Sequence, residues 1–157
     1  MPKFNVSRLV PLDVERVFDV TADVTKYSEF VPLVRESTIA NIKTLSDGRT
    51  EFDSSLTISY RKLGISDVLN SHVVVDPSNH TVTATSSEGI VKNMTTIWEV
   101  TAHPGGGSDV SYTVDYTLKS KSLQFLMSGL FDSMVRKIMT AFEDRARKLY
   151  GGAAAIS

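Results

Sequence analysis

The chain has 157 residues, with 17 Lys or Arg, 18 Asp or Glu, three His and a formal net charge of -1 at pH 7. This length allows a hydrophobic core, because a chain of this size buries roughly 70% of the surface that it exposes when unfolded. The absence of Cys excludes disulfides, thiolate nucleophiles and thiolate-held zinc or iron–sulfur sites. The balanced charge argues against broad electrostatic capture of nucleic acid, and we expect no DNA partner.

The chain also lacks the apolar segments that direct a protein into or through a membrane. No apolar run reaches the length of a membrane span, and the first ten residues, MPKFNVSRLV, do not resemble a secretory signal. We therefore expect a cytoplasmic protein. We further expect one domain over residues 3–150, followed by a disordered tail of small residues over 151–157.

The first 32 residues predict one strand and two short helices. Residues 4–10 form a short apolar strand pattern, and Asp13 then provides a helix N-cap ahead of apolar residues at helical spacing. Asp23 is a second N-cap candidate, and the helix that it begins must end before Pro32.

The middle of the chain is rich in Thr, Val, Ser and Ile and is interrupted by turn residues, which is typical of an antiparallel meander. Apolar and polar residues alternate, so each strand has one buried and one solvated face. With the N-terminal strand this predicts seven strands, the other six near residues 33–44, 50–60, 64–76, 80–86, 93–102 and 108–118.

The last periodic segment, Ser122 to Tyr150, predicts one long amphipathic helix that Gly151 and Gly152 terminate. At about 1.5 Å per residue it would span roughly 40 Å and cross a whole sheet face. The expected fold class is α+β, a helix-grip arrangement in which a curved seven-stranded antiparallel sheet wraps around the C-terminal helix. Two interpretations stay open, a solid core between the two layers or a cavity.

Turns at alternate ends of a meander can be sorted from the sequence alone. One end is polar, whereas the other carries apolar residues beside cations, which is atypical because turns favour Gly, Pro, Asn, Asp and Ser. This end is either a pocket mouth that contacts a membrane surface or a set of caps on the core. The candidate mouth residues are Arg61, Lys62, Leu63, Ile65, Ile90, Val91 and Phe125.

No pattern in the sequence indicates catalysis. His72, His80 and His103 fall on separate strands or turns without metal-ligand spacing, so we expect no metal site. No carboxylate pair or Ser-His-Asp arrangement emerges, and we expect no catalytic residues. The chain is more typical of a binding protein than of an enzyme.

Two motifs resemble a known family. The segment DVTKYSEFVP, Asp23 to Pro32, resembles a signature of the coenzyme Q-binding START-domain proteins, and the closing pattern of that family is similar to MVRKIMTAFEDRARKLYG in the last helix. An F-x-V-x-R start at Phe4, Val6 and Arg8 agrees. This family shares its group with the bacterial ribosome-association toxin proteins and belongs to the polyketide cyclase-like helix-grip superfamily.

The resemblance implies a cavity that holds a polyprenyl quinone, ubiquinone above all, in a carrier or chaperone that supports respiratory electron transfer and quinone biosynthesis. It implies no turnover and no required cofactor, and it fits transient contact with the inner face of the inner membrane. Wall candidates from the motif and from the inward pattern of strands and helix are Val24, Tyr27, Phe30, Val31, Pro32, Trp98, Tyr112, Val114, Tyr116, Leu126, Leu130, Met134 and Ile138.

Two other functions remain open. Cations of the last helix, among them Arg136, Arg145 and Arg147, could bind the large ribosomal subunit and block subunit joining, unless they pair with the acidic residues beside them. A polyketide cyclase-like enzyme is third, since it needs acid–base groups in the cavity.

Overall fold

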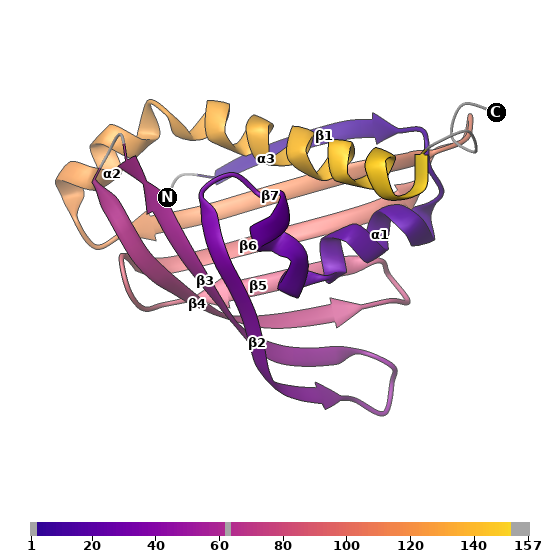
Figure 1. The fold of residues 1–157 in the computed structure, drawn as a ribbon, viewed down its shortest axis with the longest axis horizontal. Coiled ribbons are helices and arrows are strands. Elements are labelled where there is room, and N and C mark those ends of the chain that lie inside the picture. Colours follow the sequence, from indigo (N-terminus) through magenta and orange to yellow (C-terminus); the bar gives the residue numbers. More distant parts are fainter. Residues whose placement is uncertain (1–2, 62–63, 152–157) are drawn as a thin grey trace.

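The computed structural model describes residues 3–61 and 64–151. Along these residues a strand precedes two short helices, a six-stranded meander and a helical C-terminal segment (Figure 1). The elements are β1 (Lys3–Val10), α1 (Val14–Ala22), the 3-10 helix η1 (Val24–Glu29), β2 (Val34–Thr44), β3 (Thr50–Tyr60), β4 (Ile65–Asp76), β5 (Thr81–Ser86), β6 (Val91–Ala102), β7 (Ser108–Leu118), α2 (Lys121–Ser128), α3 (Phe131–Ala146) and the π-helical turn η3 (Arg147–Gly151).

The described strands form one seven-stranded antiparallel sheet in the order β1-β7-β6-β5-β4-β3-β2. Each strand from β2 to β6 pairs with the next strand in the chain. Strand β1 instead pairs with the last strand, with Asn5 opposite Thr113 and Val6 opposite Tyr112. The seven expected strands are confirmed, with bounds that differ from the observed ones by two residues at most.

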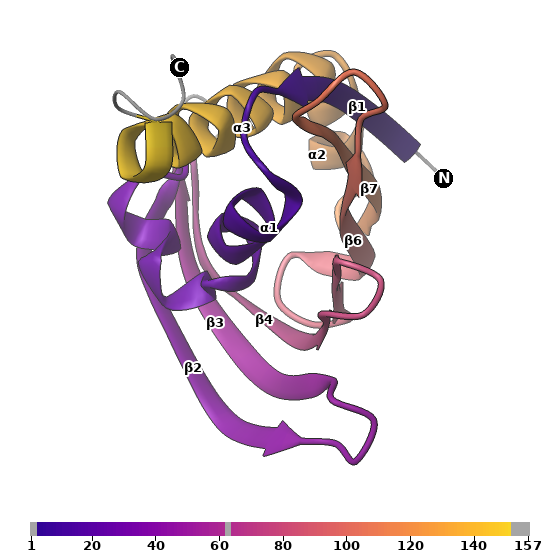
Figure 2. The ribbon, with the colours of Figure 1, turned by 90° about the vertical axis from the view of Figure 1, so that its right-hand side faces the viewer.

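The sheet curves strongly around the helices (Figure 2). Helix α3 lies across its concave face, α1 fills the space between α3 and the middle strands, and the β2–β3 hairpin projects away. Helix α1 begins as expected, because the Asp13 side chain accepts a hydrogen bond from the backbone N–H of Arg16 at 3.3 Å. Asp23 does not cap η1 with its side chain, which accepts instead from the Thr25 hydroxyl.

The expectation of one continuous C-terminal helix is wrong. Helix α2 ends at Ser128, and α3 begins at Phe131 after a break at Gly129 and Leu130. Glycine disfavours helix because it loses the most backbone entropy, and a short break there re-aims the second segment. Helix α3, with 16 residues, spans only about 24 Å.

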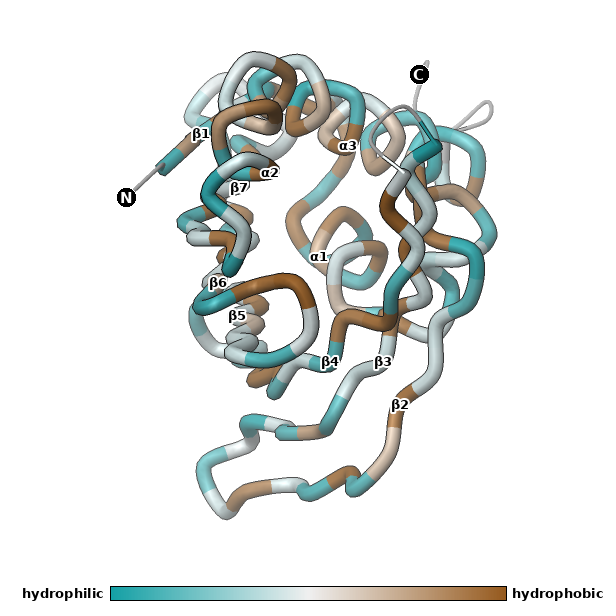
Figure 3. Tube along the Cα trace, turned by 90° about the vertical axis from the view of Figure 1, so that its left-hand side faces the viewer, coloured by the Kyte–Doolittle hydropathy of each residue, from teal (hydrophilic) through white to brown (hydrophobic). Residues whose placement is uncertain are grey.

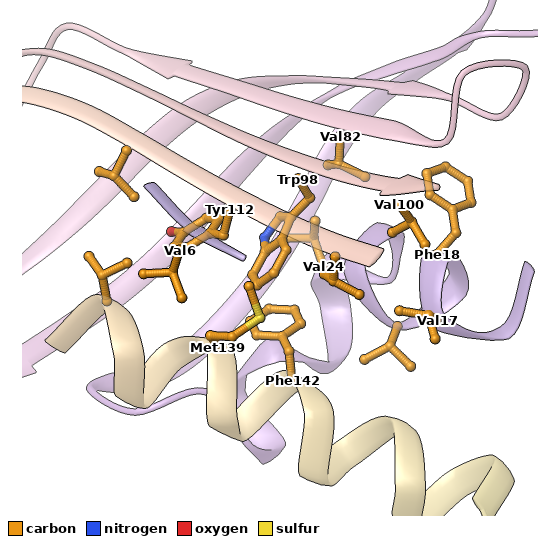
Figure 4. Close-up of a cluster of buried hydrophobic side chains, with 14 of the residues drawn as sticks. Val6, Val17, Phe18, Val24, Val82, Trp98, Val100, Tyr112, Met139 and Phe142 are labelled. Carbon is orange, nitrogen blue, oxygen red and sulfur yellow. The ribbon is translucent and has the colours of Figure 1, made fainter. Parts of the chain in front are cut away.

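The core lies between α3, α1 and the concave sheet face (Figure 4). Met139 and Phe142 of α3 point toward Trp98 of β6 and Tyr112 of β7, and Val24 lies beside them. The Trp98 and Tyr112 rings stack with centroids 4.1 Å apart, and the Phe142 ring lies 4.2 Å from that of Trp98. The helix is thereby fixed to the sheet by large aromatic contacts.

Candidate ligand-binding cavity

A cavity of about 200 Å³ lies between the sheet and α3. Its floor comes from the inner faces of β3 to β7, and its roof comes from η1, α2 and α3. The lining is overwhelmingly apolar. The sequence left open a solid core or a cavity, and the structure has the cavity. Its size is below the roughly 300–1,000 Å³ of typical small-molecule sites.

The cavity exists because short side chains occupy the middle of the inner sheet face. Ser54 lies opposite Ser71 on neighbouring strands, and Ala84 lies opposite Thr96 on the next pair. All four line the cavity. Larger rings contact α3 on either side of these short residues, Trp98 against Phe142 and Tyr116 against Phe131.

Most of the wall candidates do line this cavity. The ten that do are Val24, Tyr27, Val31, Pro32, Trp98, Tyr112, Val114, Tyr116, Met134 and Ile138. They come from η1 and the segment after it, from β6 and β7, and from one side of α3. Segments far apart in sequence thus meet around one apolar space.

Three wall candidates do not line it. Leu126 and Leu130 are 53% and 36% exposed and face outward. Apolar residues cover a broad part of the last helix, so the sequence pattern did not show which of them face inward. In the structure the buried line runs through Phe131, Val135 and Met139. Phe30 lies in a different hollow, beside Arg145 and Leu149.

The mouth candidates separate into two groups. Ile65, Ile90 and Val91 line the cavity, but Val91 is only 3% exposed and is an interior wall residue rather than part of an exposed rim. Arg61 is exposed and does not line the cavity, and Lys62 and Leu63 lie outside the described residues. Phe125 projects from α2 with 78% of its surface exposed. Figure 3 views this end and shows a hydrophobic stretch in the turn beside β5.

The two family motifs pack directly against each other. The Phe142 ring packs edge-on against Tyr27 at 5.2 Å and Phe30 at 4.9 Å. The Arg145 guanidinium donates to the Glu29 carboxylate at 2.7 Å and lies over the Phe30 ring. This hydrogen bond from Arg145 holds the pKa of Glu29 below its usual range. Phe30 therefore fastens η1 to α3.

A second set of contacts connects α3 to β1. Arg8 of β1 donates to Thr140 at 2.8 Å and to Glu143 at 3.2 Å. Glu143 also accepts from Arg147, one turn further along the chain. Together with Arg145, these contacts hold α3 against both η1 and β1, so the roof is fixed at its C-terminal half.

Sequence reasoning missed Leu33, which lines the cavity in the turn between η1 and β2. Its φ is 72°, a left-handed conformation that is uncommon for any residue except Gly. Its carbonyl accepts a hydrogen bond from the Ser59 N–H at 2.9 Å, which binds the turn to β3. An L-residue with this φ gives no signal in a single sequence.

Three of the tyrosines that line the cavity have a raised pKa. Burial raises the pKa of both Tyr27 and Tyr112 above the usual value, and the Tyr27 hydroxyl donates to the Thr21 carbonyl. Burial also raises the pKa of Tyr116, while the nearby Gln124 side chain lowers it to a lesser degree. These hydroxyls are neutral hydrogen-bonding groups and not bases at neutral pH.

The histidines lie away from the cavity and contact carboxylates. His72 lies 3.3 Å from Asp53 on the outer sheet face, and His80 lies 2.5 Å from Glu15 of α1. Among the described residues no cluster of three or more His, Cys, Asp or Glu side chains could hold a metal ion. None of the helices in that part of the chain is both long and apolar enough to cross a bilayer.

Comparison with known proteins agrees with this architecture. The chain is 26% identical over 95% of its length to the coenzyme Q-binding protein COQ10 homolog B of Xenopus laevis, but it spans only 59% of that relative. It is 23% identical to the ribosome association toxin RatA of Rickettsia prowazekii, covering 95% of this chain and 99% of the toxin. A START superfamily protein from Mycobacterium smegmatis has the same fold, with a TM-score of 0.78 at 15% identity over 94% of this chain and 98% of the other.

Most of the domain matches one known protein family. Residues 10–143 match the model described as polyketide cyclase / dehydrase and lipid transport, a span that runs from the end of β1 almost to the end of α3. It includes every element that lines the cavity. The chain therefore belongs to the polyketide cyclase, dehydrase and lipid transport family.

Proposed function

We propose that the protein binds a polyprenyl quinone of the ubiquinone type in its cavity and acts as a carrier or chaperone for it. The observation that carries this proposal is the apolar cavity between the sheet and α3. Burial of an isoprenoid tail there would contribute roughly 25 cal/mol per Å² of apolar area. The coenzyme Q-binding relative, which matches 95% of this chain, supports the choice of ligand.

The volume constrains how such a ligand fits. About 200 Å³ corresponds to about seven water volumes at roughly 30 Å³ each. This accommodates a head group or a short part of a tail, so a long polyprenyl chain must widen the cavity or extend from it. The flexible, unbranched thioether side chains of Met94, Met127 and Met134 line the cavity and suit a wall that adapts.

We propose binding without turnover, although the family includes cyclases. The ionisable side chains lining the described cavity are Tyr27, Tyr60, Asp67, Tyr112 and Tyr116. Asp67 is half-buried, and its carboxylate accepts a hydrogen bond from the backbone N–H of Val68 at 2.8 Å. General acid–base catalysis requires a group with a pKa near the working pH, and a tyrosine whose pKa is raised does not provide one.

The outer face of helix α2 is a candidate membrane-binding surface, and the membrane would be the source of the ligand. Its inner residue Met127 is 6% exposed and lines the cavity, whereas Phe125 and Leu126 point outward. The exposed lysines Lys119 and Lys121 flank this outer face and form no ion pair within the described residues. A helix that is apolar on both sides and flanked by cations suits an anionic bilayer surface.

Extraction is the first test of the quinone proposal. The protein is purified from a quinone-producing host and extracted with organic solvent, and the extract is analysed by mass spectrometry. We expect a polyprenyl quinone. We also expect a short-chain quinone to quench the fluorescence of Trp98, the only Trp in the chain and a cavity residue, in a saturable manner. An empty extract combined with no saturable quenching would refute the proposal.

Vesicle flotation tests the membrane contact. The double substitution Phe125→Ser and Leu126→Ser is expected to abolish flotation with vesicles that contain anionic lipid while leaving the thermal midpoint unchanged. Leu9→Ser is the control, because Leu9 is a 51% exposed apolar residue on β1, away from α2. Equal flotation of both variants and the unmodified protein would contradict the contact.

Ribosome association is the second candidate function, because the match to the toxin covers 99% of that relative. The charges of the last helix favour it less. Arg136 pairs with Asp132, Arg145 pairs with Glu29, and Arg147 pairs with Glu143. Cosedimentation of the intact chain with large ribosomal subunits, lost as salt is raised, would support this function, and its absence at low salt would exclude it.

A further inference from the structure

Two buried polar groups at the α2 end of the cavity have no hydrogen-bond partner among the described residues. They are the Tyr116 hydroxyl and the side-chain nitrogen Nε2 of Gln124. Tyr116 is 1% exposed and lines the cavity from β7, and Gln124 comes from α2. Buried polar groups are nearly always hydrogen-bonded, so two unpaired groups at one place need a physical explanation.

The orientation of the Gln124 amide follows from its other contact. Its Oε1 atom accepts a hydrogen bond from the backbone N–H of Leu118 at 2.6 Å. Because a backbone N–H can only donate, the atom beside it must be the oxygen, and the NH2 group is the one left without a partner. The Gln124 side chain faces the Tyr116 hydroxyl, and a side-chain hydrogen bond from it lowers the pKa of Tyr116. Even an amide that donated to the phenol oxygen would leave the hydroxyl proton without an acceptor.

The surroundings of these groups suit a flat ring that carries an oxygen acceptor. The Tyr116 ring stacks on Phe131 with centroids 4.1 Å apart and an interplanar angle of 20°, and Phe4 lies 5.0 Å from Phe131. Along β7, Tyr116 lies four residues from Tyr112, which is about 14 Å in a strand. The apolar cavity between them would hold the body of a ligand whose polar end lies beneath α2.

We propose that the Tyr116 hydroxyl, with the Gln124 side chain beside it, donates a hydrogen bond to a carbonyl oxygen of the bound ligand and so forms its head-group site. This inference rests on the proposed function, because it places one end of the same ligand. It predicts a ligand with a carbonyl at one end and an apolar body directed toward Trp98.

The test compares two probes that differ only in the acceptor, a benzoquinone and a benzene that carry the same two-isoprene tail. We expect the unmodified protein to prefer the quinone. Tyr116→Phe removes only the hydroxyl and is expected to weaken quinone binding about fivefold to tenfold, the loss of one buried hydrogen bond, while hydrocarbon binding is unchanged. Tyr150→Phe is the matched control, because it removes a tyrosine hydroxyl outside the cavity, in the hollow beside Leu149.

Infrared spectroscopy supplies a readout that a structural role would not affect. A hydrogen-bonded quinone carbonyl absorbs at lower frequency, and we expect Tyr116→Phe to return the band toward its unbound position. If Tyr116→Phe leaves the preference for the quinone unchanged or weakens both probes equally, the head-group site is refuted and the proposed function stands. If the unmodified protein binds neither probe, both are refuted.

Discussion

Enlarging Ala84 tests whether the interior is hollow. Ala84 lies on β5, lines the cavity, and has Val73 and Thr96 as its neighbours on the adjacent strands. Ala84→Leu adds three carbons, which at about 0.8 kcal/mol each correspond to about 2 kcal/mol of apolar burial. The volume rule of about 24 cal/mol per Å³ gives a similar value for about 80 Å³ of filled space, well under the 200 Å³ available.

The sign of the effect distinguishes the two cases. In a hollow interior, Ala84→Leu increases the free energy of unfolding by up to 2 kcal/mol and weakens ligand binding, because part of the site is lost. In a solid core the same change overpacks, which typically lowers stability by 1–3 kcal/mol. Urea unfolding monitored by circular dichroism measures this difference. Ala40→Leu on the exposed face of β2 is the control and should stay within about 0.5 kcal/mol. A destabilised Ala84→Leu variant would refute the cavity.

Three further predictions concern stability. Met139→Ala should lower the free energy of unfolding by about 3 kcal/mol in denaturant titrations without removing a cavity-lining group, because Met139 is 1% exposed and packs in the core. Asp13→Ala should cost about 1 kcal/mol by removing the α1 cap, measured as a lower thermal midpoint; no shift would mean that the cap is dispensable. The raised pKa of Tyr112 favours its neutral form in the fold, so its contribution to stability should hold below pH 10 and fall as pH rises above it, by up to about 1.4 kcal/mol per pH unit. The alkaline slope should therefore be smaller in Tyr112→Phe, which keeps the contributions of Tyr27 and Tyr116.

The fold was largely predictable because its strands carry the alternation that a half-buried antiparallel sheet requires. The pattern of Val110, Tyr112, Val114 and Tyr116 defined the inner face of β7 unambiguously. The C-terminal helix was less predictable. Apolar residues occupy more than one side of it, and a single Gly does not reveal from sequence whether a helix breaks or continues.

The site was only partly predictable, for a related reason. Large apolar residues identify an inner surface, but a cavity depends on where small residues meet across strands. Ser54 and Ser71 face each other only because of the register between β3 and β4, which a single sequence does not specify. Phe30 was misplaced because a motif residue can hold two elements together as readily as it can contact a ligand.

The pairing of β1 with β7 also has a consequence for synthesis of the chain. Asn5 and Thr113, which contact each other through their side chains, are 108 positions apart. At roughly 5–20 residues per second, β1 waits about 5–20 s before its partner strand has been made. During that time its apolar residues Val6 and Val10, both buried in the finished fold, have no sheet to cover them. The first strand made is thus among the last to be incorporated, and the nascent chain exposes a site for chaperones or for aggregation until β7 arrives.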